Sequence, residues 1–369
     1  MAPSVSELKP TEAVADVAAN IANLKLTNKP TQEETSLDKG PSYPFYYPYL
    51  DPNEKFPPTD IFEFSDKGLL ADKAKPNLLN ADTKVHHLSP YLGTELRNVQ
   101  ISQLSPEGLN ELALYTAERK VLIFRDQDFK DLTPERQIEI ANHFGPIQRH
   151  PTSGNVKGFP EFHVVYRDPG FDRLNRYRGF DNKINLTSWH SDVTYEKQTP
   201  GTTFFFILDQ PEVGGDTLFT SQVEAYNRLS DEFKKRLVGL RAIHSAVPQA
   251  EHSRSIGGPV RREPIETEHP VVRVHPVTGE KALFVNQGFT KSIVGFKKEE
   301  SDFLLNFLFE HIAKGADFRI RASYEPGTVV VWDNRVTVHS ATPDFDAKAA
   351  RRHAVRLTPQ AEIPIPATD

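Results

Sequence analysis

The sequence contains no cysteine, one methionine and two tryptophans. The absence of cysteine excludes disulfide bonds, thiol catalysis and cysteine-bound zinc or iron–sulfur centres. A metal site must therefore be built from His, Asp or Glu. No apolar run approaches the roughly 20 residues that a membrane-spanning helix needs. The N-terminal residues lack the profile of a secretory signal, and the C-terminal residues carry no peroxisomal address. We therefore expect a cytoplasmic protein with no membrane partner.

The charge balance also lacks a basic excess. The chain carries 44 Lys and Arg against 50 Asp and Glu, which gives a formal net charge of −6. A general nucleic-acid-binding protein would show a basic excess, so we expect no nucleic-acid partner. With 38% hydrophobic and 25% charged residues over 369 positions, the composition is typical of a globular protein with a core of ordinary size.

Three regions differ in composition. Residues 1–40 are polar and poor in glycine, which predicts a largely disordered segment. Residues 41–84 open with the sequence PSYPFYYPYLDPNEKFPP, whose proline and aromatic density predicts an extended arm on the surface of the domain or of a neighbouring subunit. A tethered loop is the alternative. Residues 85–369 are predicted to form a single domain.

Hydrophobic periodicity predicts a mainly β domain with flanking helices, an α+β class. Helical spacing covers residues 106–119, with Ser105 as a plausible N-cap, and residues 133–144, with Pro134 in the first turn. Later, short apolar runs between turn signals are typical of a β-sandwich or barrel. Strands are predicted at residues 120–124, 202–208, 216–220, 271–275, 282–286, 318–323, 328–332 and 353–357, and further helices at 224–240 and 298–312.

A candidate metal site begins with the segment Trp189-His190-Ser191-Asp192. If this segment is a strand, His190 and Asp192 point to the same side. A second imidazole is available from His339, which follows the strand predicted at 328–332. Two imidazoles and one carboxylate leave coordination positions open, as in the 2-His-1-carboxylate sites of Fe(II) oxygenases. Taken alone, the pattern is also compatible with a surface histidine next to an acidic turn residue.

Two arginines follow in the last predicted strand. Arg352 and Arg356 are four residues apart, so both side chains would face the same side of a strand. Two inward-facing guanidinium groups are costly unless each meets an anion. The arginine fork binds a planar carboxylate through two bonds. The segment therefore indicates either an anion-binding pair or an exposed basic strand face.

Together these residues resemble the taurine dioxygenase (TauD/TfdA) family of Fe(II)- and 2-oxoglutarate-dependent dioxygenases, in its fungal sulfonate dioxygenase type. The resemblance runs from about residue 85 to residue 358 and implies a double-stranded β-helix, the cupin-like jelly roll. It rests on the segments Trp189-His190-Ser191-Asp192-Val193-Thr194, Gly214-Gly215-Asp216-Thr217-Leu218, His269-Pro270-Val271-Val272-Arg273, His275-Pro276-Val277-Thr278-Gly279, Leu283-Phe284-Val285-Asn286, Gly288-Phe289-Thr290 and Trp332-Asp333-Asn334-Arg335.

The resemblance implies a role for each site residue. The iron ligands, which are also the catalytic residues, would be His190, Asp192 and His339. The cosubstrate 2-oxoglutarate would bind Thr217 and Arg352, and the small anionic substrate would bind His150, the Val193 amide, Phe289 and Arg356. Because Asp192 is a carboxylate, the resemblance argues against a halogenase, in which a small residue takes that place.

The implied reaction consumes O2 and 2-oxoglutarate and hydroxylates the carbon next to a sulfonate, releasing sulfite, an aldehyde, succinate and CO2. An alkyl sulfate, an aryloxyacetate or a secondary-metabolite carboxylate is the alternative substrate, and a non-catalytic cupin-like binding protein is the alternative class.

Two positions depart from taurine enzymes: Leu186 replaces an asparagine and Ser153 replaces a tyrosine, both near the taurine amine. We therefore expect a sulfonate other than taurine or a broader range. A homo-oligomer, dimer or tetramer, is expected, and residues 167–187 form either a basic lid or a solvated loop.

Overall fold

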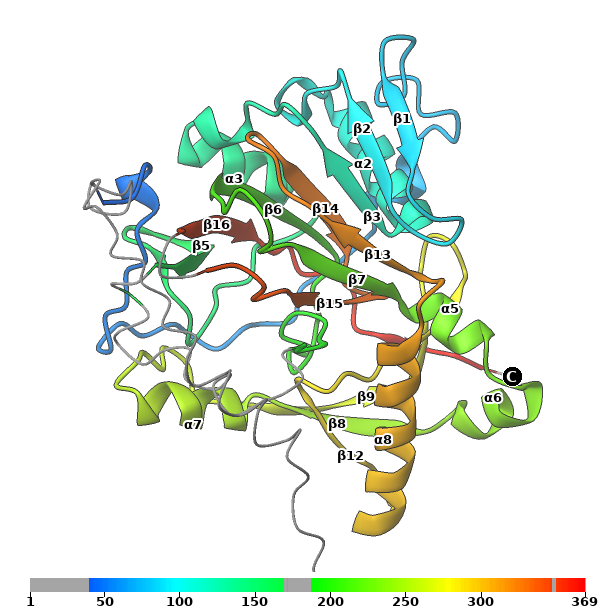
Figure 1. Cartoon of the computed structure of the whole chain (residues 1–369). Helices are drawn as coiled ribbons and strands as arrows, with labels where there is room; N and C mark the ends of the chain where they lie inside the picture. Colours follow the sequence, from blue (N-terminus) through cyan, green and yellow to red (C-terminus); the bar gives the residue numbers. More distant parts are fainter. Residues whose placement is uncertain (1–39, 169–170, 172–186, 347–349, 369) are drawn as a thin grey trace, which may run out of the picture. The chain divides into compact units, whose positions relative to one another are not determined.

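The fold is built on a large and a small β-sheet (Figure 1). The structure is a computed structural model that describes residues 40–168, 171, 187–346 and 350–368. Gly40–Asp369 form one compact unit. The large sheet has the order β1 (Lys84–His87), β2 (Thr94–Arg97), β3 (Val121–Phe124), β14 (Val329–Asp333), β6 (Thr202–Asp209), β16 (Arg352–Leu357), β5 (Phe159–Arg167) and β4 (Asn155–Val156).

Both faces of the central strands of the large sheet are buried, and strand alternation assigns each residue to one of them. In β14, Val329 and Val331 belong to a core cluster that includes Leu112 of helix α2 (Pro106–Arg119). Val330 and Trp332 belong to a second cluster on the opposite face. Since side chains alternate along a strand, each strand serves two cores, which explains why the central strands are continuous apolar runs.

The second face of the large sheet packs on the small sheet. The small sheet has the order β13 (Arg319–Ala322), β7 (Thr217–Ser221) and β15 (Thr337–Ala341). It contributes Phe219, Ile320 and Ala322 to the cluster that holds Val330 and Trp332. Two packed sheets with these connections form a jelly roll, which confirms the predicted fold. Two further sheets have the orders β12 (Thr290–Ile293), β8 (Arg241–Ser245), β9 (Glu266–Pro270) and β11 (Lys281–Leu283), β10 (Val272–Val274), β17 (Ile365–Pro366).

Serine side chains that accept a backbone hydrogen bond mark the starts of helices in this chain. Helix α2 has the predicted bounds, and its N-cap Ser105 accepts a hydrogen bond from the Gly108 amide. The helix predicted at 224–240 is instead two helices, because Ser230 caps a new start. The other helices are α3 (Pro134–Asn142), α5 (Gln222–Asn227), α6 (Asp231–Leu237), α7 (Val247–Ser255) and α8 (Lys298–Lys314). None of the helices in the described part of the chain has the length and apolar character needed to cross a bilayer.

The segment before the first strand packs on the domain. Tyr46 is buried in the core cluster of α2, and its hydroxyl donates to Gln137 Oε1 at 3.0 Å. Further along the segment, Glu54 pairs with the buried Arg261 at 2.5 Å. The arm of residues 41–84 therefore contacts its own domain, while the boundary at residue 84 stays a prediction. The disordered segment predicted at 1–40 lies outside the described residues except for residue 40.

A buried ion network connects the end of β14 to the start of β15. Asp333 accepts from Arg335 Nε at 2.8 Å and pairs with His275 Nε2 at 2.9 Å. Arg335 also meets Asp66 of the arm at 2.5 Å. These side chains are nearly fully buried. The network therefore joins three distant parts of the chain, and the next residue, Asn334, reaches the candidate site described below.

Candidate active site

Strand pairing brings two histidines together at the small sheet. His339 lies on β15, where it pairs with Phe219 of β7. His190 pairs with His339 in an isolated antiparallel bridge, with N–O distances of 3.0 and 2.8 Å. Side chains directly opposite each other in an antiparallel pair lie on the same face. The two imidazole rings are accordingly neighbours, with centroids 4.3 Å apart.

The expectation that His190 and Asp192 lie in one strand is wrong. The chain forms only the single bridge at His190, and a turn begins at Asp192. Ser191 Oγ donates to Thr337 O at 2.6 Å, and the Asp192 amide donates to Asn334 Oδ1 at 3.1 Å. These side-chain bonds replace the strand ladder. Asp192 nevertheless reaches the two imidazoles.

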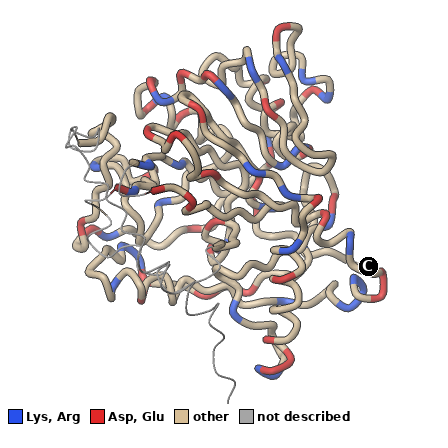
Figure 2. Tube along the Cα trace, in the orientation of Figure 1, with Lys and Arg blue, Asp and Glu red and all other residues tan. Residues whose placement is uncertain are grey.

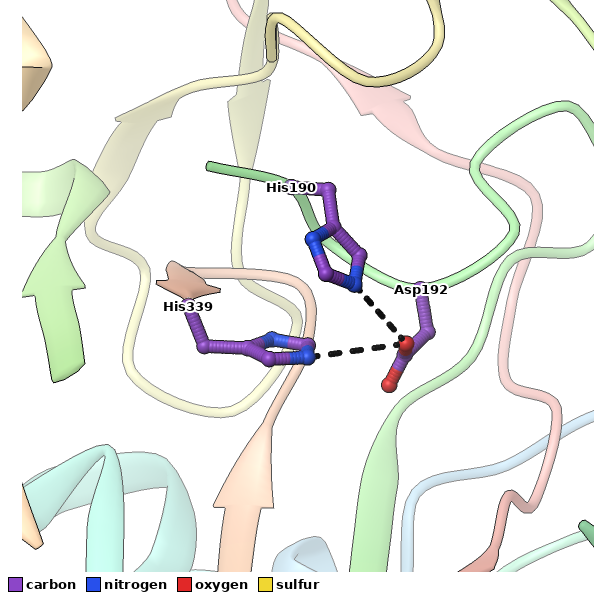
Figure 3. A group of neighbouring side chains, drawn as sticks. All are labelled: His190, Asp192 and His339. Carbon is purple, nitrogen blue, oxygen red and sulfur yellow. Dashed lines mark ion pairs between the residues drawn. The ribbon is translucent and has the colours of Figure 1, made fainter. Parts of the chain in front are cut away.

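The three side chains converge on one point (Figure 3). Asp192 Oδ1 lies 3.7 Å from His190 Nε2 and 3.6 Å from His339 Nε2. Two atoms that each bond one ion at about 2.1 Å are at most about 4.2 Å apart, so both separations fit a shared ion. Among the residues that the structure describes, this is the one group of three potential ligands within 4.8 Å of one another.

Both imidazoles are neutral, and the Nε2 atom of each lies toward Asp192. His190 Nδ1 lies 2.8 Å from Ser188 O, which places the proton on Nδ1 and leaves the lone pair on Nε2. Burial lowers the pKa of His190, and it lowers the pKa of His339 to about 3. The Nε2 lone pair of His190 therefore faces the carboxylate, and the neutral His339 places its own Nε2 beside the same group, as metal ligation requires.

The carboxylate of Asp192 is anionic and partly unpaired. Burial alone would raise the pKa of Asp192, but the nearby Arg356 charge holds it below its usual value. Arg356 Nη1 donates to Oδ1, whereas Oδ2 is buried without a hydrogen-bond partner among the described residues. A buried, unsatisfied carboxylate oxygen is costly unless an ion or donor meets it. The donor set of two neutral nitrogens and one carboxylate fits Fe(II) with open coordination positions.

A cavity of about 220 Å³ lies over this group. Every residue that the sequence predicted for the site lines it: His150, His190, Asp192, Val193, Thr217, Phe289, His339, Arg352 and Arg356. Residues that the sequence analysis left out also line it, and they include His163, Phe205, Gln249, Tyr324 and Trp332. Phe205 and Trp332 also belong to the second core cluster, so they both pack in the core and line the cavity.

Arg352, Thr217 and Tyr324 form one connected part of the cavity lining. The Arg352 Nε donates to Gly215 O at 2.7 Å, so within the described chain both Nη atoms keep their donors for an anion. The guanidinium lies over the Phe205 and Tyr324 rings at 5.6 Å from each centroid. Thr217 Oγ1 and Tyr324 Oη are 2.7 Å apart. Tyr324 comes after β13, and nothing in its local sequence indicates that it meets Thr217.

Arg356 lines the cavity and bridges Asp192 and His163. Its Nη2 donates to His163 Nδ1 at 2.7 Å, and its Nε is buried without a partner among the described residues. Burial and the Arg356 charge hold the pKa of His163 well below its usual value. The sequence analysis did not single out His163. It lies beside Arg356 because β5 pairs with β16, and this pairing leaves no local pattern in the sequence.

His150 presents a neutral N–H donor to the same cavity. Its Nδ1 accepts from the amides of Thr152 and Ser153 at 3.3 and 3.1 Å, which places the ring proton on Nε2. Burial, followed by the Arg356 charge, lowers the pKa of His150 to about 3. The ring packs against His163, with centroids 4.4 Å apart.

Val193 and Phe289 shape the remaining wall. Val193 has a φ of 39°, which is strained for a β-branched residue. This conformation turns the chain sharply after Asp192. Phe289 packs edge-on against Tyr195 and His190, with centroids 5.2 and 6.2 Å away. Leu186 and nearly all of the predicted lid at 167–187 lie outside the described residues.

Lys and Arg are interspersed with Asp and Glu over the described chain (Figure 2). Arg352 and Arg356, which line the cavity, are among the buried arginines. The cavity therefore combines a metal-ligand group with two cationic side chains, which is an environment for small anions.

The chain matches a family model. Residues 84–358 match the model described as taurine catabolism dioxygenase TauD, TfdA family. This range contains the three converging side chains and both arginines. It also agrees with the extent of the resemblance seen in the sequence.

Individual relatives agree with the family match. The chain is 50% identical over 337 residues to the α-ketoglutarate-dependent dioxygenase cnsM of Penicillium expansum, covering 90% of this chain and 93% of the relative. It is 42% identical over 327 residues to the α-ketoglutarate-dependent sulfonate dioxygenase of Saccharomyces cerevisiae, covering 88% and 79%. A crystal structure of a putative α-ketoglutarate-dependent taurine dioxygenase from Burkholderia xenovorans has a TM-score of 0.64 at 32% identity, covering 77% and 94%.

Proposed function

Because this chain belongs to the taurine catabolism dioxygenase TauD, TfdA family, we propose that it is an Fe(II)- and 2-oxoglutarate-dependent dioxygenase of organosulfonates. O2 delivers one oxygen atom to the carbon that bears the sulfonate and the other to 2-oxoglutarate, which becomes succinate and CO2. The hydroxylated carbon then loses sulfite and becomes an aldehyde. The sulfonate substrate is supported by the name of the 42% identical relative from Saccharomyces cerevisiae.

One observation carries the proposal. A single cavity holds two neutral imidazoles, one carboxylate and two buried arginines. His190, Asp192 and His339 would hold Fe(II), which when bound supplies the activation of O2. The protein side chains bind and orient the two anions beside it.

Each arginine would take a different anion. Arg352 and the Thr217 hydroxyl would bind the distal carboxylate of 2-oxoglutarate, because the Arg352 Nη donors are free of protein acceptors among the described residues. Arg356 and the His150 Nε2 proton would bind the sulfonate, with the Val193 amide beside them and Phe289 against the carbon chain. Holding the sulfonate at a fixed point orients the adjacent carbon, and such orientation contributes several kcal/mol.

Replacing Arg352 should weaken 2-oxoglutarate binding. Arg352→Met keeps an unbranched apolar stem but removes two charge-assisted hydrogen bonds, each worth about 1.5–3 kcal/mol. We expect the KM for 2-oxoglutarate to rise at least about 150-fold, measured as succinate formed. Arg351→Met is the matched control, because Arg351 is also buried but bonds Tyr166 Oη at 3.1 Å. An equal KM in both variants would reject the assignment.

Replacing Arg356 should weaken binding of the sulfonate. Arg356→Ala removes the cation proposed to meet the sulfonate, and we expect the sulfonate KM to rise at least about tenfold. The KM for 2-oxoglutarate should stay within about threefold, because Arg352 and Thr217 are untouched. The measurement is sulfite release against sulfonate concentration at saturating 2-oxoglutarate. An unchanged sulfonate KM would remove Arg356 from the substrate site.

A cytoplasmic homodimer or homotetramer completes the proposal. The compartment and the assembly rest on the sequence analysis. The small anion is the substrate proposed for the active site. Light scattering on the purified chain tests the assembly.

A further inference from the structure

A second cavity adjoins the active-site cavity. We call the cavity over the metal-ligand group the inner cavity, and its neighbour of about 260 Å³ the outer cavity. Four residues line both of them: Ser153, His163, Val165 and Gln249. These shared side chains form a common wall of the two spaces. A substrate held at Arg356 would enter the outer cavity past this wall.

The described lining of the outer cavity offers no carboxylate to a cationic substrate. It has no Asp, Glu, Lys or Arg and combines apolar side chains, Pro48, Leu50, Val164, Val165, Tyr166, Phe171 and Ile256, with polar ones, Thr152, Ser153, His163, Gln249, His252 and Ser253. The inner cavity contains one carboxylate, Asp192, and that group already meets Arg356 and the two imidazoles. The ammonium group of taurine would thus be buried without a counter-charge, which is costly. An apolar tail would instead gain from burial.

The N-terminal arm forms a fixed wall of the outer cavity. Tyr49 exchanges backbone hydrogen bonds with Asn155 at 2.8 and 3.2 Å, which holds the neighbouring residues Pro48 and Leu50 in place. A Cβ at Gly154 would come within 2.6 Å of Pro48 Cβ, so glycine is what allows the arm to approach this closely.

One fully buried arginine ties the arm to the shared wall. Arg261 donates to Ser153 O at 2.6 Å and to Tyr49 O at 3.1 Å, and it pairs with Glu54 at 2.5 Å. The arm and the Ser153 loop are therefore positioned by the same side chain. This preorganisation gives the outer cavity a defined shape before a substrate enters.

We propose that the outer cavity binds the apolar tail of the substrate, so that the preferred sulfonates carry a hydrocarbon chain of about four to eight carbons and no ammonium group. This inference rests on the proposed function, since it names the substrate class of the same site. The arm then sets chain-length preference through Pro48 and Leu50. Each methylene buried in the outer cavity should raise kcat/KM about fourfold.

The test is sulfite release from taurine and from ethane-, butane-, hexane- and octanesulfonate. We expect kcat/KM to be at least about tenfold higher for hexanesulfonate than for ethanesulfonate or taurine. Leu50→Trp fills the outer cavity from the arm and should lower the hexane-to-ethane ratio of kcat/KM at least tenfold. Leu69→Trp is the matched control, because Leu69 lies on the same arm with a 57% exposed side chain.

The outcomes separate the two proposals. If no sulfonate yields sulfite while 2-oxoglutarate is still consumed with another anion, the proposed substrate fails. If sulfite is released but taurine or ethanesulfonate is preferred, the outer-cavity inference is overturned and the sulfonate dioxygenase proposal stands. If Leu50→Trp fails to fold, the chain-length series of the unmodified protein still decides the inference.

Discussion

Asp192→Ala is expected to reduce turnover by more than about 100-fold. Loss of a partner that merely supports a metal ligand costs 10- to 100-fold, so loss of a ligand should cost more. The substitution removes the one carboxylate of the group and the atom that lies 3.6–3.7 Å from both imidazoles. The measurement is the initial rate of succinate formation with Fe(II), 2-oxoglutarate and a sulfonate.

Two controls make this result interpretable. Asp231→Ala removes a carboxylate at an exposed helix start and should leave the rate unchanged. Thermal unfolding of the Asp192→Ala variant in the absence of iron should show a folded protein. A folded variant with full turnover would contradict the metal assignment, whatever the family of the chain.

Asp333→Asn is expected to lower the free energy of unfolding by about 3–5 kcal/mol. Asp333 holds Arg335 through Nε at 2.8 Å and Nη2 at 2.6 Å, and all of these atoms are buried. Removing the charge leaves Arg335 with fewer anionic partners in a site that water does not reach. The matched control is Asp317→Asn, which breaks an exposed pair with Arg228 and should cost no more than about 1 kcal/mol. The measurement is urea unfolding of both variants at pH 7.

The stabilisation by Asp333 should also depend on pH. Burial would raise the pKa of Asp333, but Arg335 and His275 hold it well below its usual value. A carboxylate with a depressed pKa contributes stability that is present above the unfolded pKa of about 3.9 and is lost as the pH falls below it. The difference between the parent protein and Asp333→Asn should therefore shrink below about pH 4. A difference that grows in acid would contradict this account.

The sequence predicted the helices and strands whose formation depends on neighbouring residues, such as a helix cap or a continuous apolar run. Helix α2 has the predicted bounds because Ser105 caps it and Pro106 favours its first turn. The central strands were visible because burial on both faces makes them continuous apolar runs. Strand β15 was missed, since its sequence TVHSA is short and has neither a continuous apolar run nor a regular alternation. It is buried by its place beside β7, which is a property of the fold.

The site residues also fall into those that the sequence indicated and those that only long-range contacts bring together. His190, Asp192 and His339 were found through residue chemistry and family likeness, and they meet in space. The reason given for the pair at 190 and 192 was wrong, because bonds from Ser191 and Asn334 replace the strand. His163 and Tyr324 were missed because their roles depend on cross-strand pairing and on a contact over 107 residues of chain. Such long-range contacts leave no local pattern.

The central claim is that His190, Asp192 and His339 hold one Fe(II) that binds 2-oxoglutarate. An anaerobic titration of the protein with Fe(II) and 2-oxoglutarate, followed by visible absorption, tests it most directly. The account predicts a new absorption band that saturates at one Fe(II) per chain, shifts when hexanesulfonate is added, and is absent in His339→Ala. A band of equal intensity in His339→Ala, or no band in the parent protein, would contradict it.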